Sequence, residues 1–446
     1  MSDELLTGII QTETKPIIFS APKNSFIFSF MTDSMHVFPK RAETVKIPTS
    51  DGFIYGKTHS NYDIAIYLGN KSFEVSGKAA MNTAAYVKSC ANGIEQDIRE
   101  FETISFKGGT LNSVFNIDAM NIDHCDGALV IRANDDSIKY SFHTETEEIN
   151  VCIRSEIREQ FGVQGNAIVN NDVILTLEFE KRQPLSRAFE CYNGIKNLLS
   201  FLTFRYNVGF DGIYISNTHP KVQERIKIAD IYIRSDYELT SKMEFDNIHF
   251  NEIINQLPAL TKMFFGTDDE DLTEIGFYPK NDQDVSFMSD AKLREICSAL
   301  ECELKYIDDI KAKENKLLNE LIDLTRKAIK NFRRENKGLS NDTYNMIFSS
   351  IGYWSFSLAE KLCALYHKYE EEMTVLNVTD ITINDTLIKS FVKYRNDITH
   401  GRHRIPDIEI AVTAHYLSGL VYCCILERVG VDRKNILKFC KDKLLK

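Results

Sequence analysis

The chain has 446 residues, of which 43% are hydrophobic and 26% charged, and its formal net charge is −11. This composition is typical of a soluble globular protein and excludes a disordered or collagen-like chain, while the length predicts two to three domains. Ten scattered cysteines without a Cys-x-x-Cys pair favour reduced thiols and give no zinc-binding spacing. No basic segment followed by a long apolar core begins the chain, so we expect a cytoplasmic protein without a metal or cofactor.

The first 180 residues contain short runs of aromatic and β-branched residues between turn signals. The clearest runs are 25–30, 62–68, 128–132, 138–142 and 173–177. Runs with this spacing predict the strands of a sandwich or barrel. A helix is predicted at 184–204 with Pro184 at its start, followed by strands at 212–215 and 229–233 and a short helix at 249–257.

The acidic segment 267–274, which lies between Gly266 and Gly276, marks the end of this region. It lacks the alternating ligands and central glycine of a calcium loop, so we interpret it as a solvated linker. We place the β-rich region at 1–280 and a helical region at 281–446. The predicted fold class is therefore α+β.

The C-terminal region has helical periodicity throughout. Apolar residues recur at steps of three and four from Ile347 to Tyr369, which predicts one long helix packed in a core. A bundle of five or six helices is expected, from helices near 289–304, 307–334, 342–372, 384–400, 407–429 and 432–445. Their short connections favour antiparallel neighbours in a bundle. The apolar run 410–426 approaches membrane length, but polar residues interrupt it, and we expect a buried central helix.

The helix predicted at 384–400 carries the candidate site. Arg395 lies at the edge of its apolar stripe, whereas Asn396 and His400 lie on the polar face near Lys393. Five steps turn an α-helix by about 500°, so Arg395 and His400 are about 140° apart and do not easily converge on one phosphate. Either Gly401 unwinds the last turn, or a second copy of the chain supplies its own pair across a two-fold axis.

The sequence Arg395-Asn396-x-x-x-His400 resembles the R-polar-x(3)-H signature of HEPN domains, helical bundles of which many are metal-independent endoribonucleases active as dimers. A strand-rich region ahead of such a domain is similar to ApeA-type abortive-infection proteins of bacteria. The segments that carry this second likeness are 51–57, 106–109, 177–179 and 197–202. The resemblance covers nearly the whole chain. It implies a HEPN-like bundle, a homodimer or higher oligomer, RNA as substrate with tRNA as one candidate, and anti-phage defence released by a phage-derived trigger.

The resemblance also implies roles for the residues of the motif. The RNA 2′-hydroxyl would attack the phosphorus, with His400 as general base or acid, since a histidine pKa of about 6.5 permits proton transfer near neutrality. Arg395 would clamp the non-bridging oxygens, and Asn396 would orient the imidazole or the phosphate. The neighbouring basic residues Lys393, Arg402, His403 and Arg404 are the candidates for holding the RNA backbone.

Charge is distributed unevenly along the chain. From residue 281 onward there are 26 basic and 25 acidic residues, so the N-terminal part carries −12. We expect that part to repel RNA, and therefore to sense another molecule or restrain the helical region. The segment 311–337 holds nine basic residues against four acidic ones, and is either a phosphate-binding surface or a solvated helix face.

Three other interpretations remain open. The motif could be structural, with His400 favourably placed against the helix dipole and Arg395 paired with Asp385 or Glu409. A non-catalytic HEPN-type module could bind RNA or a protein. The chain could also be an interaction protein whose acidic β region docks a basic partner.

Overall fold

The computed structural model describes residues 5–13, 15–32, 44–47, 49–69, 73–76, 78–90, 97–115, 117, 120–125, 128–133, 137–161, 167–235, 237, 248, 250–265, 275–280, 282–285, 287–307, 310, 316–336, 338, 340–351, 357–376, 380–402 and 405–442. For 120–133, 157–161 and 167–170 it describes the backbone alone. The chain divides into two compact units, Met1–Thr267 and Asp268–Lys446. The division falls in the acidic segment 267–274, whereas the sequence analysis placed the domain boundary at 280. Each unit is described by itself.

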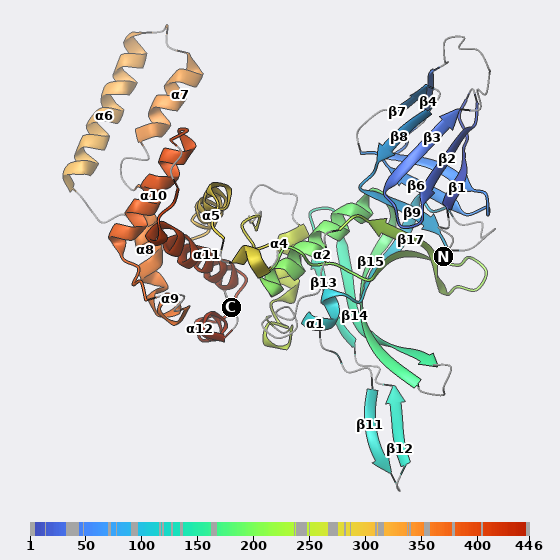
Figure 1. Ribbon diagram of the computed structural model, residues 1–446. Coiled ribbons are helices and arrows are strands. Elements are labelled where there is room, and N and C mark those ends of the chain that lie inside the picture. Colours follow the sequence, from blue (N-terminus) through green and yellow to red (C-terminus); the bar gives the residue numbers. More distant parts are fainter. Residues whose placement is uncertain are drawn as a thin grey trace. The chain divides into compact units, whose positions relative to one another are not determined.

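The first unit is built on one antiparallel sheet of thirteen strands, hydrogen bonded in the order β13-β14-β15-β10-β16-β17-β9-β6-β5-β1-β2-β3-β8 (Figure 1). Two further pairs, β4 with β7 and β11 with β12, form two-stranded sheets. The strands are β1 Leu5–Ile10, β2 Ile17–Pro22, β3 Ile27–Thr32, β4 Thr44–Ile47, β5 Phe53–Thr58, β6 Asp63–Tyr67, β7 Phe73–Ser76, β8 Lys78–Asn82, β9 Ala85–Ser89, β10 Glu100–Lys107, β11 Met120–Cys125, β12 Ala128–Ala133, β13 Ser137–His143, β14 Glu148–Phe161, β15 Ala167–Pro184, β16 Gly212–Thr218 and β17 Arg225–Ile233. The strand-rich N-terminal region is thus confirmed. Hydrogen bonding links the main strands into one sheet, which the strand pattern alone did not indicate.

The period of two along each strand gives the sheet one apolar and one polar face. Across β14, β15, β10 and β16, the register aligns a buried aliphatic row of Val151, Leu177, Ile104 and Ile215. One residue along, the same strands align a row of smaller polar and aromatic side chains on the opposite face, such as Thr176 beside Ser105. A one-residue slip would exchange the two faces, so burial of the aliphatic row specifies the register.

Helices cover the apolar face of the second half of this sheet. They are α1 Thr110–Val114, α2 Arg187–Thr203 and α4 Leu257–Phe265, preceded by a 3₁₀ turn, η1, at Phe250–Glu252. Tyr140 on β13 hydrogen bonds to Thr261 on α4 (3.0 Å), and the Phe142 and Phe265 rings lie 5.1 Å apart. The predicted start of α2 at Pro184 is wrong, because Pro184 is the last residue of β15 and the helix begins after Ser186.

The second unit is helical in its described parts. Its elements are a 3₁₀ turn, η2, at Asp282–Val285, and helices α5 Asp290–Glu303, α6 Lys316–Glu335, α7 Asn341–Ser350, α8 Leu358–Lys368, α9 Glu370–Leu376, α10 Asp385–Thr399, α11 Ile408–Arg428 and α12 Arg433–Asp442. The α+β class is therefore confirmed. The single helix predicted at 342–372 is wrong, because α7, α8 and α9 occupy that range. Ser357 caps α8 in a reciprocal capping box with Glu360, a signal that starts a new helix.

Helix α11 forms the core of this unit. It packs against α5, α9, α10 and α12, and nearly all its residues from Ile410 to Leu426 are buried. By length and composition it is the one described helix that would pass for a membrane span, but 78% of its most apolar window is buried inside the protein. The predicted buried central helix is thus confirmed.

Candidate active site on helix α10

Helix α10 begins at a side-chain cap and is held by its apolar face. The Asn384 carboxamide oxygen accepts hydrogen bonds from the Thr386 and Leu387 amides, at 2.9 and 3.1 Å. The helix packs against α5, α8 and α11, and its buried face includes Phe391 and Ile398. The motif therefore lies on a helix anchored by three neighbours, and its polar residues are presented on a rigid support.

The end of α10 is closed by its own backbone. The His400 amide donates to the Asn396 carbonyl (3.1 Å), so the helical turn continues up to His400. The Gly401 amide then donates to Ile398 and the Arg402 amide to Asp397, at 3.2 and 2.9 Å, which is the Schellman motif. Gly401 has the left-handed φ of +77° that this motif requires. An unwound last turn, the first of the two routes by which Arg395 and His400 could converge, is therefore not found.

Arg395 is held by an acidic residue from another helix. One guanidinium nitrogen donates to Glu301 of α5 (2.9 Å), and the other donates to the Asn396 side-chain oxygen (3.3 Å). The two side chains of the ion pair remain 25% and 43% exposed. The sequence analysis pointed to Asp385 or Glu409 as the structural partner, and this is wrong. Glu301 is distant in sequence and has no motif that would have identified it.

His400 and Asn396 are both exposed, as the helical periodicity indicates. Asn396 is brought to Arg395 by its hydrogen bond, whereas His400 occupies the capping position at the end of the helix. The structure thus joins Arg395 with Asn396 and places His400 one turn further on.

The basic residues expected to hold RNA are divided. Lys393 is exposed, and Arg402 donates to Asp397 (3.2 Å) while its side chain stays 74% exposed. His403 and Arg404 lie outside the described residues. The charges at the described part of the site are therefore open to solvent, where a phosphate could approach them.

Two large apolar residues next to the motif were missed by the sequence analysis. Ile405 is 95% exposed and Ile408 is 69% exposed. Helical periodicity could not identify them as exposed, because Ile405 precedes helix α11 and Ile408 is its first residue. These two residues would contribute apolar area if another molecule contacts this part of the chain.

The first unit has a polar cavity of about 580 Å³ on its sheet. Its lining includes the hydroxyls of Ser105 and Thr176 and the cations Lys139, Arg154, Arg225 and Lys227. Arg225 pairs with Glu178, and Lys227 pairs with Asp230 at 2.6 Å. Arg154 pairs with Glu156 at 3.6 Å, so three of the four cations are neutralised by carboxylates and the cavity is not a strong anion site.

Within the ranges that the structure describes, no three His, Cys, Asp or Glu side chains group closely enough to hold a metal ion. The nine described cysteines are free thiols. Comparison of the chain with protein-family models, with curated proteins and with solved structures finds no match in any of the three.

Proposed function

We propose that the chain is a metal-independent endoribonuclease of the HEPN type that acts in bacterial anti-phage defence in the cytoplasm. The observation that carries the proposal is the exposed His400 at the end of a rigid helix, one turn beyond the Arg395 and Asn396 pair. The C-terminal unit would then be a HEPN-like bundle, with RNA, tRNA among the candidates, as its substrate.

In this reaction the RNA supplies its own nucleophile. The imidazole of His400 takes the proton of the 2′-hydroxyl, the 2′-oxygen bonds to phosphorus, and the bond from phosphorus to the 5′-oxygen breaks. The leaving 5′-oxygen receives a proton, so the products are a 2′,3′-cyclic phosphate and a 5′-hydroxyl. Arg395 would stabilise the charge on the non-bridging oxygens, a contribution on the order of 10²-fold or more in rate.

A second copy of the chain would complete the site. With the last turn of α10 intact, Arg395 and His400 point in directions that differ by about 140°. A two-fold axis beside the motif would bring Arg395 of one copy near His400 of the other and supply a second imidazole as general acid. The exposed Ile405 and Ile408 support this arrangement, because a partner at the motif would cover them.

The ion pair with Glu301 is compatible with this role. Exposed pairs of this kind contribute roughly 0 to 1 kcal/mol, so exchanging Glu301 for a phosphate costs little. The pair holds Arg395 in place without substrate and releases it when a stronger anion arrives. The acidic N-terminal unit would sense the phage-derived trigger or restrain the nuclease.

The test incubates the purified full chain with bulk tRNA in EDTA and identifies the new RNA ends. We expect cyclic phosphate and 5′-hydroxyl ends, and a rate at least 10²-fold lower in His400→Ala and Arg395→Ala. Lys389→Ala is the matched control, because it removes one exposed positive charge from the same helix. RNA binding is measured in parallel by fluorescence anisotropy.

Equal cleavage by both alanine variants would show that other residues carry the reaction. RNA binding that depends on Arg395, without cleavage by any variant, would favour a non-catalytic RNA-binding module. The observation that favours this second function is that Arg395 already binds an anion, the Glu301 carboxylate, and could bind a phosphate in the same way.

A further inference from the structure

Helix α6 leaves a stripe of large apolar side chains in solvent. Leu317 is 79% exposed, Leu321 52%, Leu324 57% and Phe332 57%, and Ile322 is the only buried residue of the helix. The first three leucines and Ala328 follow one another at steps of four, three and four, which is the a/d spacing of a coiled-coil seam. An amphipathic surface helix normally buries such a stripe against a neighbour.

The neighbouring helix α7 covers a different face of α6. The two helices lie side by side (Figure 1), and cations of α6 stack on aromatic rings of α7. Arg333 lies 3.8 Å from the centre of the Tyr344 ring, and Lys330 lies 5.4 Å from that of Phe348. Ile322 is one residue, or about 100°, away from Leu321. The apolar stripe is therefore a second face, separate from the one that meets α7.

We propose that this stripe pairs antiparallel with α6 of a second copy of the chain. In the register that buries most leucine, Leu321 lies beside Leu324 of the partner subunit, and Leu317 lies beside Ala328 of the partner subunit. The two-fold axis repeats both contacts, so each end of the helix pair has a leucine, Leu317, packed against an alanine, Ala328. Shifting the pair by one heptad would place Leu321 against Asn331 and Leu317 against Glu335, which buries polar groups.

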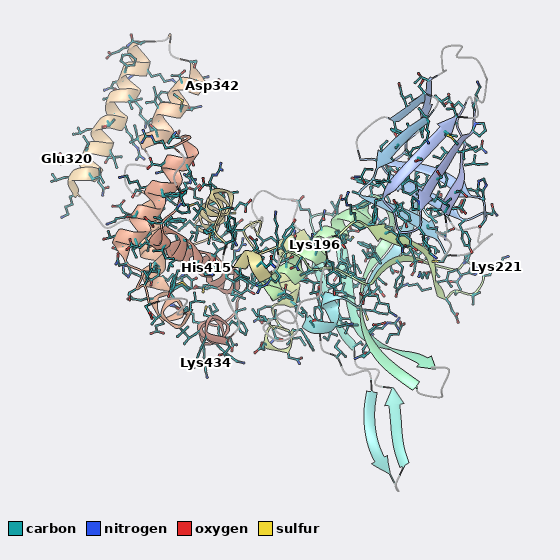
Figure 2. All side chains as sticks on the ribbon, in the orientation of Figure 1. Lys196, Lys221, Glu320, Asp342, His415 and Lys434 are labelled. Atoms are coloured by element: carbon teal, nitrogen blue, oxygen red, sulfur yellow. The ribbon has the colours of Figure 1, made fainter. Side chains whose placement is uncertain are left out.

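Charge complementarity indicates that the apolar stripe of α6 is covered by α6 of a second copy of the chain. Glu320 borders the stripe on the side of α6 away from α7 (Figure 2), and Lys327 follows on the same side two turns later. Antiparallel pairing brings Glu320 of each copy against Lys327 of the partner subunit, so opposite charges meet twice. Parallel pairing would bring Glu320 beside Thr325 and lose both contacts.

This pairing goes beyond the proposed nuclease and does not depend on it. A chain that cleaves no RNA would still pair through α6, and the test reads association alone.

The test measures sedimentation velocity of the full chain over a wide range of protein concentration at low salt. The wild type should form a dimer, and Glu320→Lys or Lys327→Glu should each weaken it on the order of tenfold, because attraction becomes repulsion at two places. The double variant carrying both changes restores opposite charges and should recover the dimer. Asp323→Lys is the matched control, with the same change of charge about 135° from the stripe, and should dimerise like the wild type.

Leu321→Asp should remove the association that α6 contributes, so that this variant associates no better than the single charge variants, while circular dichroism confirms that its helices remain. Two results would overturn the proposal. One is a wild type that stays monomeric throughout, as expected if the stripe packs on its own chain. The other is a double charge variant that dimerises no better than the single ones.

Discussion

A half-buried histidine in the core helix should make the second unit sensitive to mild acid. His415 lies on α11 (Figure 2), and burial lowers its pKa from 6.5 to about 4, with a smaller contribution from the nearby Lys292. The neutral imidazole is therefore the form that the folded protein holds. In the unfolded chain the same group has an ordinary pKa of about 6.5.

The sign and size of the effect follow from these two values. Between pH 6.5 and 4 the unfolded chain binds a proton that the folded chain does not, so the free energy of unfolding falls as pH falls. Each unit of pKa difference corresponds to about 1.4 kcal/mol, so the whole effect approaches roughly 3 kcal/mol and about 2 kcal/mol of it lies between pH 7 and 5. For a unit of this size that is a decrease of about 4 to 8 °C in melting temperature.

The assay compares thermal unfolding of the wild type and His415→Gln at pH 7 and pH 5, followed by circular dichroism at a helical wavelength. Glutamine fills a similar space and does not titrate, so we expect the variant to lose several degrees less than the wild type on acidification. Other carboxylates and histidines titrate equally in both proteins and cancel in the comparison. The same decrease in both would show that His415 is protonated within the fold, and would refute the reasoning.

Glu301→Gln removes the carboxylate that competes with RNA for Arg395, so we expect tRNA binding to tighten a few-fold in fluorescence anisotropy at low salt; weaker binding would mean that the pair positions Arg395. Arg433→Ala leaves Glu372, which is 2% exposed and accepts two bonds at 3.0 and 2.8 Å, without its cation. In thermal unfolding, the free energy of unfolding should fall by about 3 kcal/mol. An unchanged free energy of unfolding would contradict a buried charge at Glu372. Gly401→Ala places an alanine at a backbone φ of +77°, which should lower the free energy of unfolding by about 1 kcal/mol in the same assay. Gly401→Asn should lower it by less.

Local signals in the sequence were sufficient for the order of the elements and for several of their ends. Asn384 and Asp407 cap α10 and α11, because an acceptor side chain at these positions bonds the first free amides of a helix. Gly401 ends α10, because the Schellman motif needs a left-handed residue. The exposure of Asn396 and His400 follows from a period of 3.6 residues, which depends on the helix alone.

Contacts between distant segments decided the rest. Pro184 continues β15 because that strand pairs with Glu100 at the start of β10, a partner that no local pattern reveals. Glu301 reaches Arg395 only because α5 packs against α10. The same holds for α6, whose periodicity predicts an amphipathic helix but not which of its two apolar faces is covered. Periodicity specifies how side chains are arranged around an element, whereas burial and pairing depend on what the rest of the chain brings beside it.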